Sequence, residues 1–192
     1  MSSPAPVHSS AAAPSLPATA WAVLGLLSFG EELSGYGLKK WADSSLRFFY
    51  WSPAISQIYG ELRRLEALGY VESRTVPQDE LRKKRLYRIT DAGREALTDW
   101  ANHAPVEPPV LKHSVALRVW LGHLTGPERL REVVAQHIAE TEAVLDALRA
   151  AREIAETTPE WRYPATVERW GEKYYETQKA LAQELLDELE GV

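Results

Sequence analysis

The chain contains no cysteine among its 192 residues. This excludes disulfide bridges, thiolate nucleophiles and every zinc or iron–sulfur site with cysteine ligands, and it is consistent with a reducing compartment. The longest apolar run, Ala20 to Leu27, is interrupted by Gly25 and is far shorter than the roughly 18 residues that a membrane span needs. We therefore expect a cytoplasmic protein without contact to a membrane.

Motifs for catalysis and metal binding are missing as well. No two of the five histidines are spaced four residues apart; they are His8, His103, His113, His123 and His137. There is no glycine-rich phosphate loop and no Gly-x-Ser-x-Gly motif. The sequence thus predicts no metal site, no cofactor and no enzymatic activity.

Prolines mark the expected boundaries between the parts of the chain. The first sixteen residues combine small residues with prolines, lack the features of a secretory signal, and are predicted to be a disordered tail. Pro105, Pro108 and Pro109 interrupt the helical pattern further on. We expect two domains, residues 17–103 and 104–192.

Charge is distributed unevenly between these two domains. The whole chain has a net charge of −5, but residues 17–103 carry +1 and residues 104–192 carry −6. Residues 47–88 contain nine basic and five acidic side chains, a local charge of +4. Such an asymmetry is typical of nucleic-acid binding by one part of a chain.

The periodicity of the first domain changes from helical to extended. Ser34 is predicted to cap the second helix, Ser52 to cap the third, and Gly69 to end the third in a left-handed conformation. Thr90 is predicted to cap the fourth helix. The expected elements are helices over residues 17–28, 34–46, 53–68 and 91–102, and strands over 70–76 and 85–89 joined by a charged loop of residues 77–84. This order is that of a winged helix-turn-helix, so the predicted fold is mainly α with a small β-hairpin wing.

The second domain is predicted to be helical throughout. Two helices are expected over residues 111–124 and 166–189. A long helix between them is expected to begin at a capping box formed by Thr125 and Glu128. The apolar seam of the long middle helix is Leu130, Val134, His137, Thr141, Val144, Leu148, Ala151 and Ala155, and that of the last helix is Val167, Trp170, Tyr174, Leu181, Leu185 and Leu189. Two such helices alone bury little surface, which indicates an α-helical dimerisation domain.

Four segments resemble one family when they are taken in this order and at this spacing. They are LGLL from Leu24, SGYGL from Ser34, QIYGELRRLEALGYVE from Gln57 and KRLYRITDAGREAL from Lys84. The chain resembles the PadR family of transcriptional regulators over about 85 residues. The resemblance implies a homodimer that binds an inverted-repeat DNA operator, usually as a repressor, and responds to a small aromatic effector.

The third predicted helix would enter the major groove with its N-terminal half. Ser52, Ser56, Tyr59 and Arg63 are spaced to share its exposed face. The PadR resemblance implies that Tyr59 contacts DNA, with Ser56 and Gln57 as its neighbours. The alternative is that Tyr59 is a half-buried aromatic residue.

The basic end of the hairpin loop is a second candidate contact. Lys83, Lys84 and Arg85 are expected to bind phosphates, whereas Asp79 and Glu80 argue against contact by the tip itself. The alternative is a solvated charged loop.

Aromatic residues of the second domain have two interpretations. These residues can pack in the core and in a subunit interface. Alternatively, the PadR resemblance implies an effector pocket, for which Trp120 and Trp170 are the first candidates. For the whole protein, the alternative to a ligand-responsive DNA-binding regulator is a winged-helix protein-interaction module without specific DNA binding.

Overall fold

The computed structural model describes residues 16–79 and 82–191, which form two compact units. The first unit contains the chain up to Lys40 together with Pro53–Pro105, and the second contains Trp41–Ser52 together with Val106–Val192. The sequence had placed residues 41–52 in the winged helix, but their contacts group them with the second unit. The predicted tail lies outside the described residues except for Leu16, which is buried.

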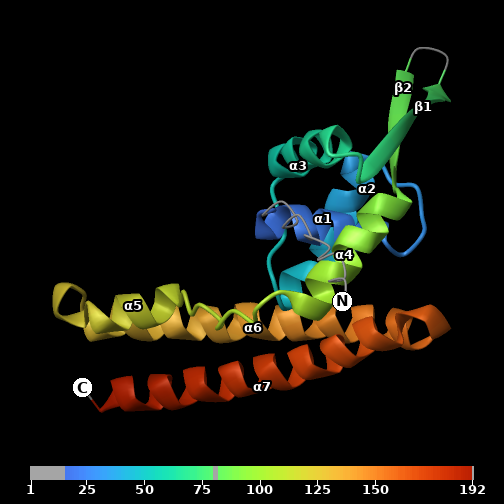
Figure 1. The fold of residues 1–192 in the computed structure, drawn as a ribbon. Helices are drawn as coiled ribbons and strands as arrows, with labels where there is room; N and C mark the ends of the chain where they lie inside the picture. Colours follow the sequence, from blue (N-terminus) through green and yellow to red (C-terminus); the bar gives the residue numbers. More distant parts are fainter. Residues whose placement is uncertain (1–15, 80–81, 192) are drawn as a thin grey trace, which may run out of the picture. The chain divides into compact units, whose positions relative to one another are not determined.

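Helix α1 (Ala18–Leu27) forms the centre of the first unit, where it packs against helices α3 and α4 and strand β2 (Figure 1). It is apolar on nearly every side because it has neighbours on nearly every side. Its buried residues are Ala20, Trp21, Val23, Leu24, Leu26 and Leu27, all of which lie in the longest apolar run of the sequence. The other helices in this region are α2 (Gly35–Ser44), whose last residues belong to the second unit, α3 (Ile55–Ala67) and α4 (Asp91–His103).

Two predicted caps and one predicted helix end are confirmed. The hydroxyl of Ser34 accepts a hydrogen bond from the Gly37 N–H at 3.1 Å, and that of Thr90 accepts one from the Gly93 N–H at 3.1 Å. Gly69 has φ +72° and follows the C-terminus of α3.

The third helix begins later than predicted. Helix α3 starts at Ile55, because the Oε1 of Gln57 accepts a hydrogen bond from the Ala54 N–H at 2.8 Å and so completes the first turn. The hydroxyl of Ser52 donates instead to Oδ1 of Asp43 at 2.5 Å. Ser52 therefore lies before the helix, and the prediction that it caps α3 is wrong.

The hairpin is longer than predicted. Strands β1 (Val71–Asp79) and β2 (Arg82–Ile89) pair antiparallel, with Pro77 opposite Lys83 and Val76 opposite Lys84. The predicted loop of residues 77–84 is thus mostly strand. Apolar alternation stops at Val76 because the hairpin leaves the core there, whereas backbone pairing needs no apolar side chains and continues.

The second unit is built on a pair of long antiparallel helices, α6 (Pro127–Glu156) and α7 (Arg162–Glu190). Helix α5 (Ser114–Trp120) packs on α6. The short 3₁₀ segments of the described residues are η1 (Leu46–Phe48), η2 (Gly122–Leu124) and η3 (Pro159–Trp161).

The predicted capping box at the start of α6 is wrong. Pro127 occupies the first helical turn and makes Gly126 the N-cap, one residue after Thr125.

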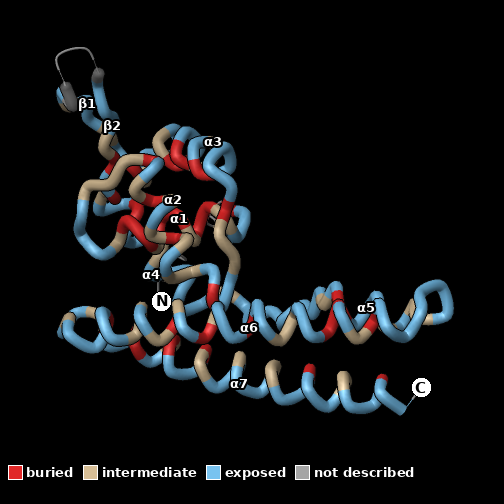
Figure 2. The backbone as a smooth tube through the Cα atoms, turned by 180° about the vertical axis from the view of Figure 1, so that it is seen from behind, coloured by how far each residue is buried: buried red, intermediate tan, exposed pale blue. Residues whose placement is uncertain are grey.

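The seam of α6 is largely as predicted, but that of α7 is not. On α6 the buried residues are Leu130, Val133, Val134, Thr141, Leu145, Leu148 and Ala155. On α7, Trp170, Tyr174 and Leu181 are exposed. The inner face visible in Figure 2 contains Leu189, which was predicted, together with Ala165, Glu168, Gly171 and Ala182, which were not. A Cβ at Gly171 would come within 3.2 Å of Leu148 Cδ2, so small residues on α7 allow the two helices to approach closely. The large aromatic side chains are consequently left outside.

Within the described ranges 16–79 and 82–191, no helix is long and apolar enough to cross a membrane.

Candidate nucleic-acid interface

Helix α3 has one face in the core and one face in solvent. Ile58, Leu62 and Leu65 are fully buried and fix the rotation of the helix. The opposite face is exposed and contains four of the predicted contact residues, Ser56, Gln57, Tyr59 and Arg63. Ser52 does not belong to this face because it precedes the helix.

Tyr59 packs on the first turn of α2 while 40% of its surface stays exposed. A Cβ at Gly35 would lie 2.5 Å from Cε1 of Tyr59 and 3.0 Å from its hydroxyl oxygen, so the ring rests directly on the glycine. The phenol is therefore held at the exposed surface by contact with α2. Sequence analysis missed this role of Gly35; the glycine of the SGYGL segment was the available signal.

Arg85 connects the hairpin to α3. Its Nε donates to the Ser73 hydroxyl at 2.7 Å, and its NH2 group donates to both carboxylate oxygens of Glu66 at 2.7 and 2.8 Å. The Ser73 hydroxyl also donates to Glu66 at 2.6 Å. The hydrogen bond from Ser73, followed by that from Arg85, holds the pKa of Glu66 below its ordinary value. The guanidinium that the sequence assigned to DNA thus already has a protein partner.

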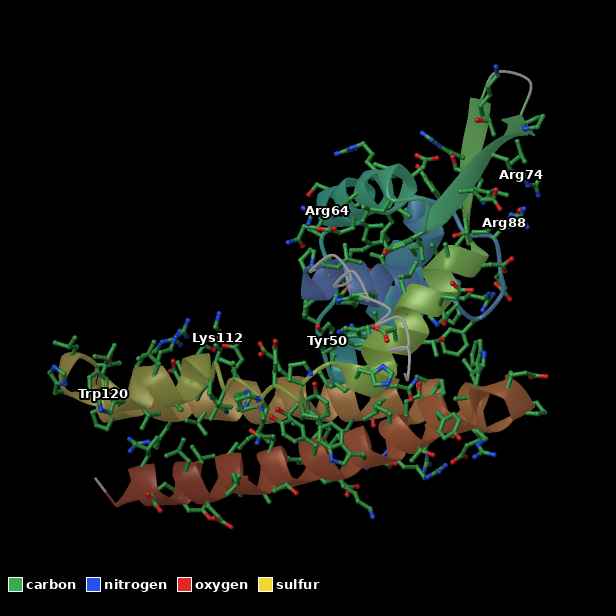
Figure 3. All side chains as sticks on the ribbon, viewed as in Figure 1. Tyr50, Arg64, Arg74, Arg88, Lys112 and Trp120 are labelled. Carbon is green, nitrogen blue, oxygen red and sulfur yellow. The ribbon has the colours of Figure 1, made fainter. Side chains whose placement is uncertain are left out.

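Other arginines of the basic segment are also paired. Arg74 contacts Glu32 through Nε at 3.0 and 2.9 Å, and Arg88 contacts Glu72 on the facing strand at 2.6 Å (Figure 3). Arg64 lies 3.4 Å from Glu61 on α3. The local charge of +4 is therefore only partly available to a ligand.

Three predicted cations have no ion-pair partner among the described residues. Lys83 and Lys84 on β2 and Arg63 on α3 are exposed and have no ion pair within the part of the chain that the structure describes. Together with Ser56, Gln57 and Tyr59 they form what we call the α3–wing surface.

The Glu66–Arg85 pair gives an expected pH dependence. Because the folded-state pKa of Glu66 is lowered, its stabilising contribution is present above the ordinary glutamate pKa and is lost as pH falls through the folded pKa. Replacing Glu66 with Gln should cost roughly 0.5–1 kcal/mol at neutral pH, a small value because both side chains are partly exposed to solvent. Urea denaturation of the two proteins should show this difference at neutral pH and none under strongly acidic conditions; a difference that is equal at both would contradict it.

The two effector candidates are found on different elements. Trp120 ends α5 and is 78% exposed, while Trp170 on α7 is 55% exposed and stacks on Tyr174 with ring centroids 5.5 Å apart. Within the part of the chain that the structure describes, the two tryptophans do not line a common pocket.

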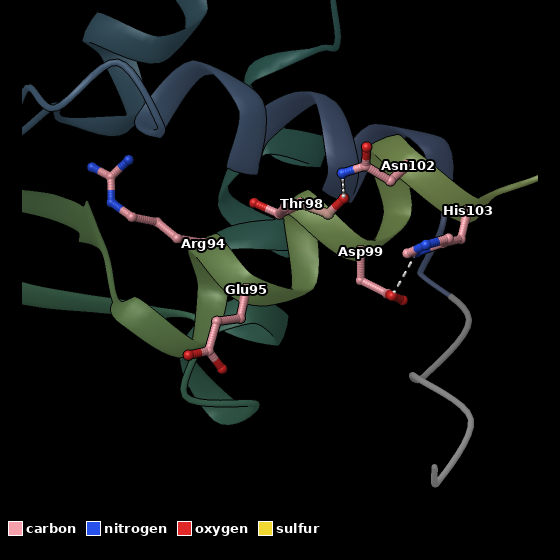
Figure 4. Close-up of a pocket in the computed structure, with 6 residues that line it drawn as sticks. All are labelled: Arg94, Glu95, Thr98, Asp99, Asn102 and His103. Atoms are coloured by element: carbon pink, nitrogen blue, oxygen red, sulfur yellow. Dashed lines mark hydrogen bonds and ion pairs between the residues drawn. The ribbon is translucent and has the colours of Figure 1, made fainter.

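A hollow of about 370 Å³ lies on the first unit (Figure 4). All of its lining residues, Arg94, Glu95, Thr98, Asp99, Asn102 and His103, belong to α4. The side chain of Asn102 is hydrogen-bonded to Thr98, and that of His103 is hydrogen-bonded to Asp99, both on the same helix. A hollow with a single wall lacks the enclosure of a small-molecule site.

A winged helix with an exposed recognition helix, followed by a long helical hairpin, defines the class of DNA-binding transcriptional regulators with a C-terminal helical domain. Family models agree: residues 23–99 match the transcriptional regulator PadR-like family, and residues 111–190 match the virulence activator alpha C-terminal family. The negative transcriptional regulator PadR of Bacillus subtilis is 32% identical over 134 residues, which cover 69% of this chain and 72% of that protein. The chain belongs to the PadR family, a family of transcriptional regulators and not of enzymes.

Solved structures show the same fold. The PadR-like regulator BC1756 from Bacillus cereus has 28% identity and a TM-score of 0.74, covering 92% of this chain and 99% of that one. Bacillus subtilis PadR in complex with operator DNA has 24% identity and a TM-score of 0.75, covering 90% and 99%. The predicted fold class is thereby confirmed.

Proposed function

We propose that this regulator binds an inverted-repeat operator as a homodimer, acts as a repressor and is released by a small aromatic effector. The observation that carries the proposal is the α3–wing surface, where hydrogen-bonding groups are exposed together with cations that have no ion pair within residues 16–77 and 83–191. The 32% identical relative is named a negative regulator, and the same Bacillus protein has been crystallised with operator DNA and with p-coumaric acid. A repressor of this kind acts in the cytoplasm, where its operator is.

The geometry suits insertion into a major groove. Thirteen residues of α3 span about 20 Å at 1.5 Å per residue, so the N-terminal half reaches base edges while the rest crosses the backbone. We assign base contacts to Ser56 and Tyr59 and phosphate contacts to Arg63, Lys83 and Lys84. Gln57 acts mainly through its hydrogen bond to Ala54, which fixes the start of the helix. Arg85 orients the hairpin through Glu66.

The homodimer is supported by the outer face of α7. Trp170, Tyr174 and Leu181 are 55%, 40% and 51% exposed, although large apolar side chains are usually withdrawn from water. A second copy that covers them would remove this apolar surface from solvent and would place two winged helices on one operator.

Titration of the chain's own promoter DNA, followed by fluorescence anisotropy, tests the proposal. Binding with a dissociation constant on the order of 10⁻⁸ M at moderate salt is expected, together with a two-fold symmetric footprint. Failure of micromolar protein to bind at low salt, with the protein shown to be folded and dimeric, would refute operator binding and favour a protein-interaction module.

The two wing lysines should account for part of the salt dependence. Lys83→Ala combined with Lys84→Ala is expected to reduce the slope of log affinity against log salt by about one for each lost phosphate contact. Lys112→Ala, which removes an exposed cation from the second unit, is the control and should leave the slope unchanged. An unaltered slope in the double variant would remove the wing from the interface.

A further inference from the structure

Helix α5 is a short element that few apolar side chains hold on the second unit. It has seven residues, of which only Val115 is buried, while Val119 packs against the core as a partly buried residue. A helix of this length is not stable by itself in water, so α5 depends on its cap and on its packing against α6. A change that weakens both should release the whole element.

The side chain that caps α5 is an imidazole. Nδ1 of His113 accepts a hydrogen bond from the Ala116 N–H at 3.2 Å. Helix caps are usually serine, threonine, aspartate or asparagine, whose oxygen atoms still accept in mildly acidic solution. An imidazole nitrogen accepts only while it is unprotonated. Protonation of His113 therefore removes the cap and places a positive charge at a helix N-terminus, where the helix dipole disfavours it.

A second imidazole, on α6, lies against the first. The rings of His113 and His137 meet edge-on, with their centroids 5.0 Å apart. Nε2 of His137 is buried and has no hydrogen bond to any described part of the chain, although buried polar atoms are normally paired. Burial, and then the neighbouring His113, lower the pKa of His137. A proton on His137 would place a charge in a contact that is built for neutral rings.

The surrounding charges do not reverse this preference. Glu140 on α6 raises the pKa of His137, but its effect is smaller than those of burial and of the second ring. Glu184 and Glu188 of α7 line the same hollow as the two rings, and both are exposed to water, which screens their charge. Lys112, which precedes the capping residue, adds a positive charge. Protonation of the pair is thus disfavoured while α5 is docked.

We propose that His113 and His137 form a pH-sensitive contact that holds α5 on α6 near neutral pH and releases it in mildly acidic solution. After protonation the cap is lost and the two positive rings repel each other. Release would separate Val115 from the core and would free the segment between α4 and α5 at its second end.

The direction of the effect follows from the lowered pKa of His137. Because this pKa lies below the ordinary value of 6.5, the contribution of the neutral ring to stability is fully present above pH 6.5. The contribution is lost as the pH falls through the folded-state pKa. Histidine is the side chain whose ordinary titration falls in this range, so mild acidification is sufficient to act on the contact.

Hydrogen exchange followed by mass spectrometry measures the docking of α5 in the full-length protein without DNA. Protection factors, which correct for the effect of pH on the exchange chemistry, are compared at about pH 7.5 and about pH 5.5. Protection of α5 should fall by about tenfold or more, since each histidine that must stay neutral in the docked state contributes up to about tenfold over this interval. Peptides of α1, which has no ionisable side chain, should keep their protection. Equal protection of α5 at the two pH values overturns the proposal.

Asparagine at position 113 separates capping from titration, because its amide oxygen caps a helix but takes up no proton. His113→Asn should keep α5 protected at about pH 7.5 and should reduce the pH dependence, and the further change His137→Gln should abolish it. His123→Asn, which removes an exposed histidine of η2, is the matched control and should retain the full pH effect. A pH dependence that survives in the double variant would assign the effect to other groups and contradict the proposal. None of these measurements depends on operator binding.

Discussion

Gly35→Ala is expected to weaken operator binding by a factor of about 10 to 100, as much as Tyr59→Ala, although residue 35 has no side chain to offer to DNA. The added Cβ would lie 2.5 Å from Cε1 of Tyr59, which no real pair of carbon atoms tolerates. The ring can rotate away, so the fold survives while the phenol leaves the position from which it reaches the groove. Fluorescence anisotropy with operator DNA measures the loss.

Two other glycines provide matched controls. A Cβ at Gly37, in the same turn of α2, would meet Oγ of Ser34 at 3.5 Å, an ordinary contact, and a Cβ at Gly60 on α3 would meet nothing within 4 Å. Alanine at either position should leave affinity nearly unchanged.

A double-mutant cycle then separates positioning from general damage. In the Tyr59→Ala background, Gly35→Ala should cost nothing further, because the ring that it displaces is already absent. Additive losses would show that Gly35 acts by another route.

The local chemistry of this sequence was sufficient to predict most of the first unit. Ser34, Gly69 and Thr90 each act within a few residues of their own position, so their roles as caps and helix end follow from residue type. The start of α3 was misplaced because Ser52 has a more distant partner, Asp43, nine residues earlier in the chain. A residue pattern does not reveal which of two possible hydrogen bonds a hydroxyl will make.

The partners of charged residues could not be predicted for the same reason. Arg85 and Glu66 are nineteen residues apart, and they meet only because the register of the hairpin places Arg85 opposite Thr75 and near the end of α3. Lys84 and Lys83, one and two positions further toward the tip, have no acidic partner among the residues that the structure describes. A sequence shows how many charges a segment has, whereas the tertiary structure determines which of them are available to DNA.

Helix α7 shows a further limit of sequence patterns. Hydrophobicity selected Trp170, Tyr174 and Leu181 as its inner face, yet Gly171 and Ala182 face α6. Two long helices that approach closely place small residues between them, and the stripe of large residues points outward. The sequence predicted that this stripe serves subunit association, and in the proposed dimer it would face the second copy.

Gly93→Ala is expected to unfold the first unit most strongly of all single substitutions considered. A Cβ at residue 93 would lie 2.2 Å from the carbonyl oxygen of Tyr70 and 2.9 Å from Cγ1 of Ile89. The Tyr70 carbonyl cannot move aside easily, because it accepts the Thr90 N–H at 3.0 Å. Helix α4 would have to leave the hairpin, at a cost of about 3 kcal/mol or more.

The comparison with another helical glycine isolates this steric effect. A Cβ at Gly25 in α1 would meet nothing within 4 Å, so Gly25→Ala should stabilise the protein by up to about 1 kcal/mol through helix propensity alone. Urea denaturation followed by circular dichroism should move the two midpoints in opposite directions. If Gly93→Ala proved as stable as the unmodified chain, the first turn of α4 could not pack as closely on Tyr70 as the structure shows. The α3–wing surface depends on the same packing, because Tyr70 connects the end of α3 to the beginning of β1.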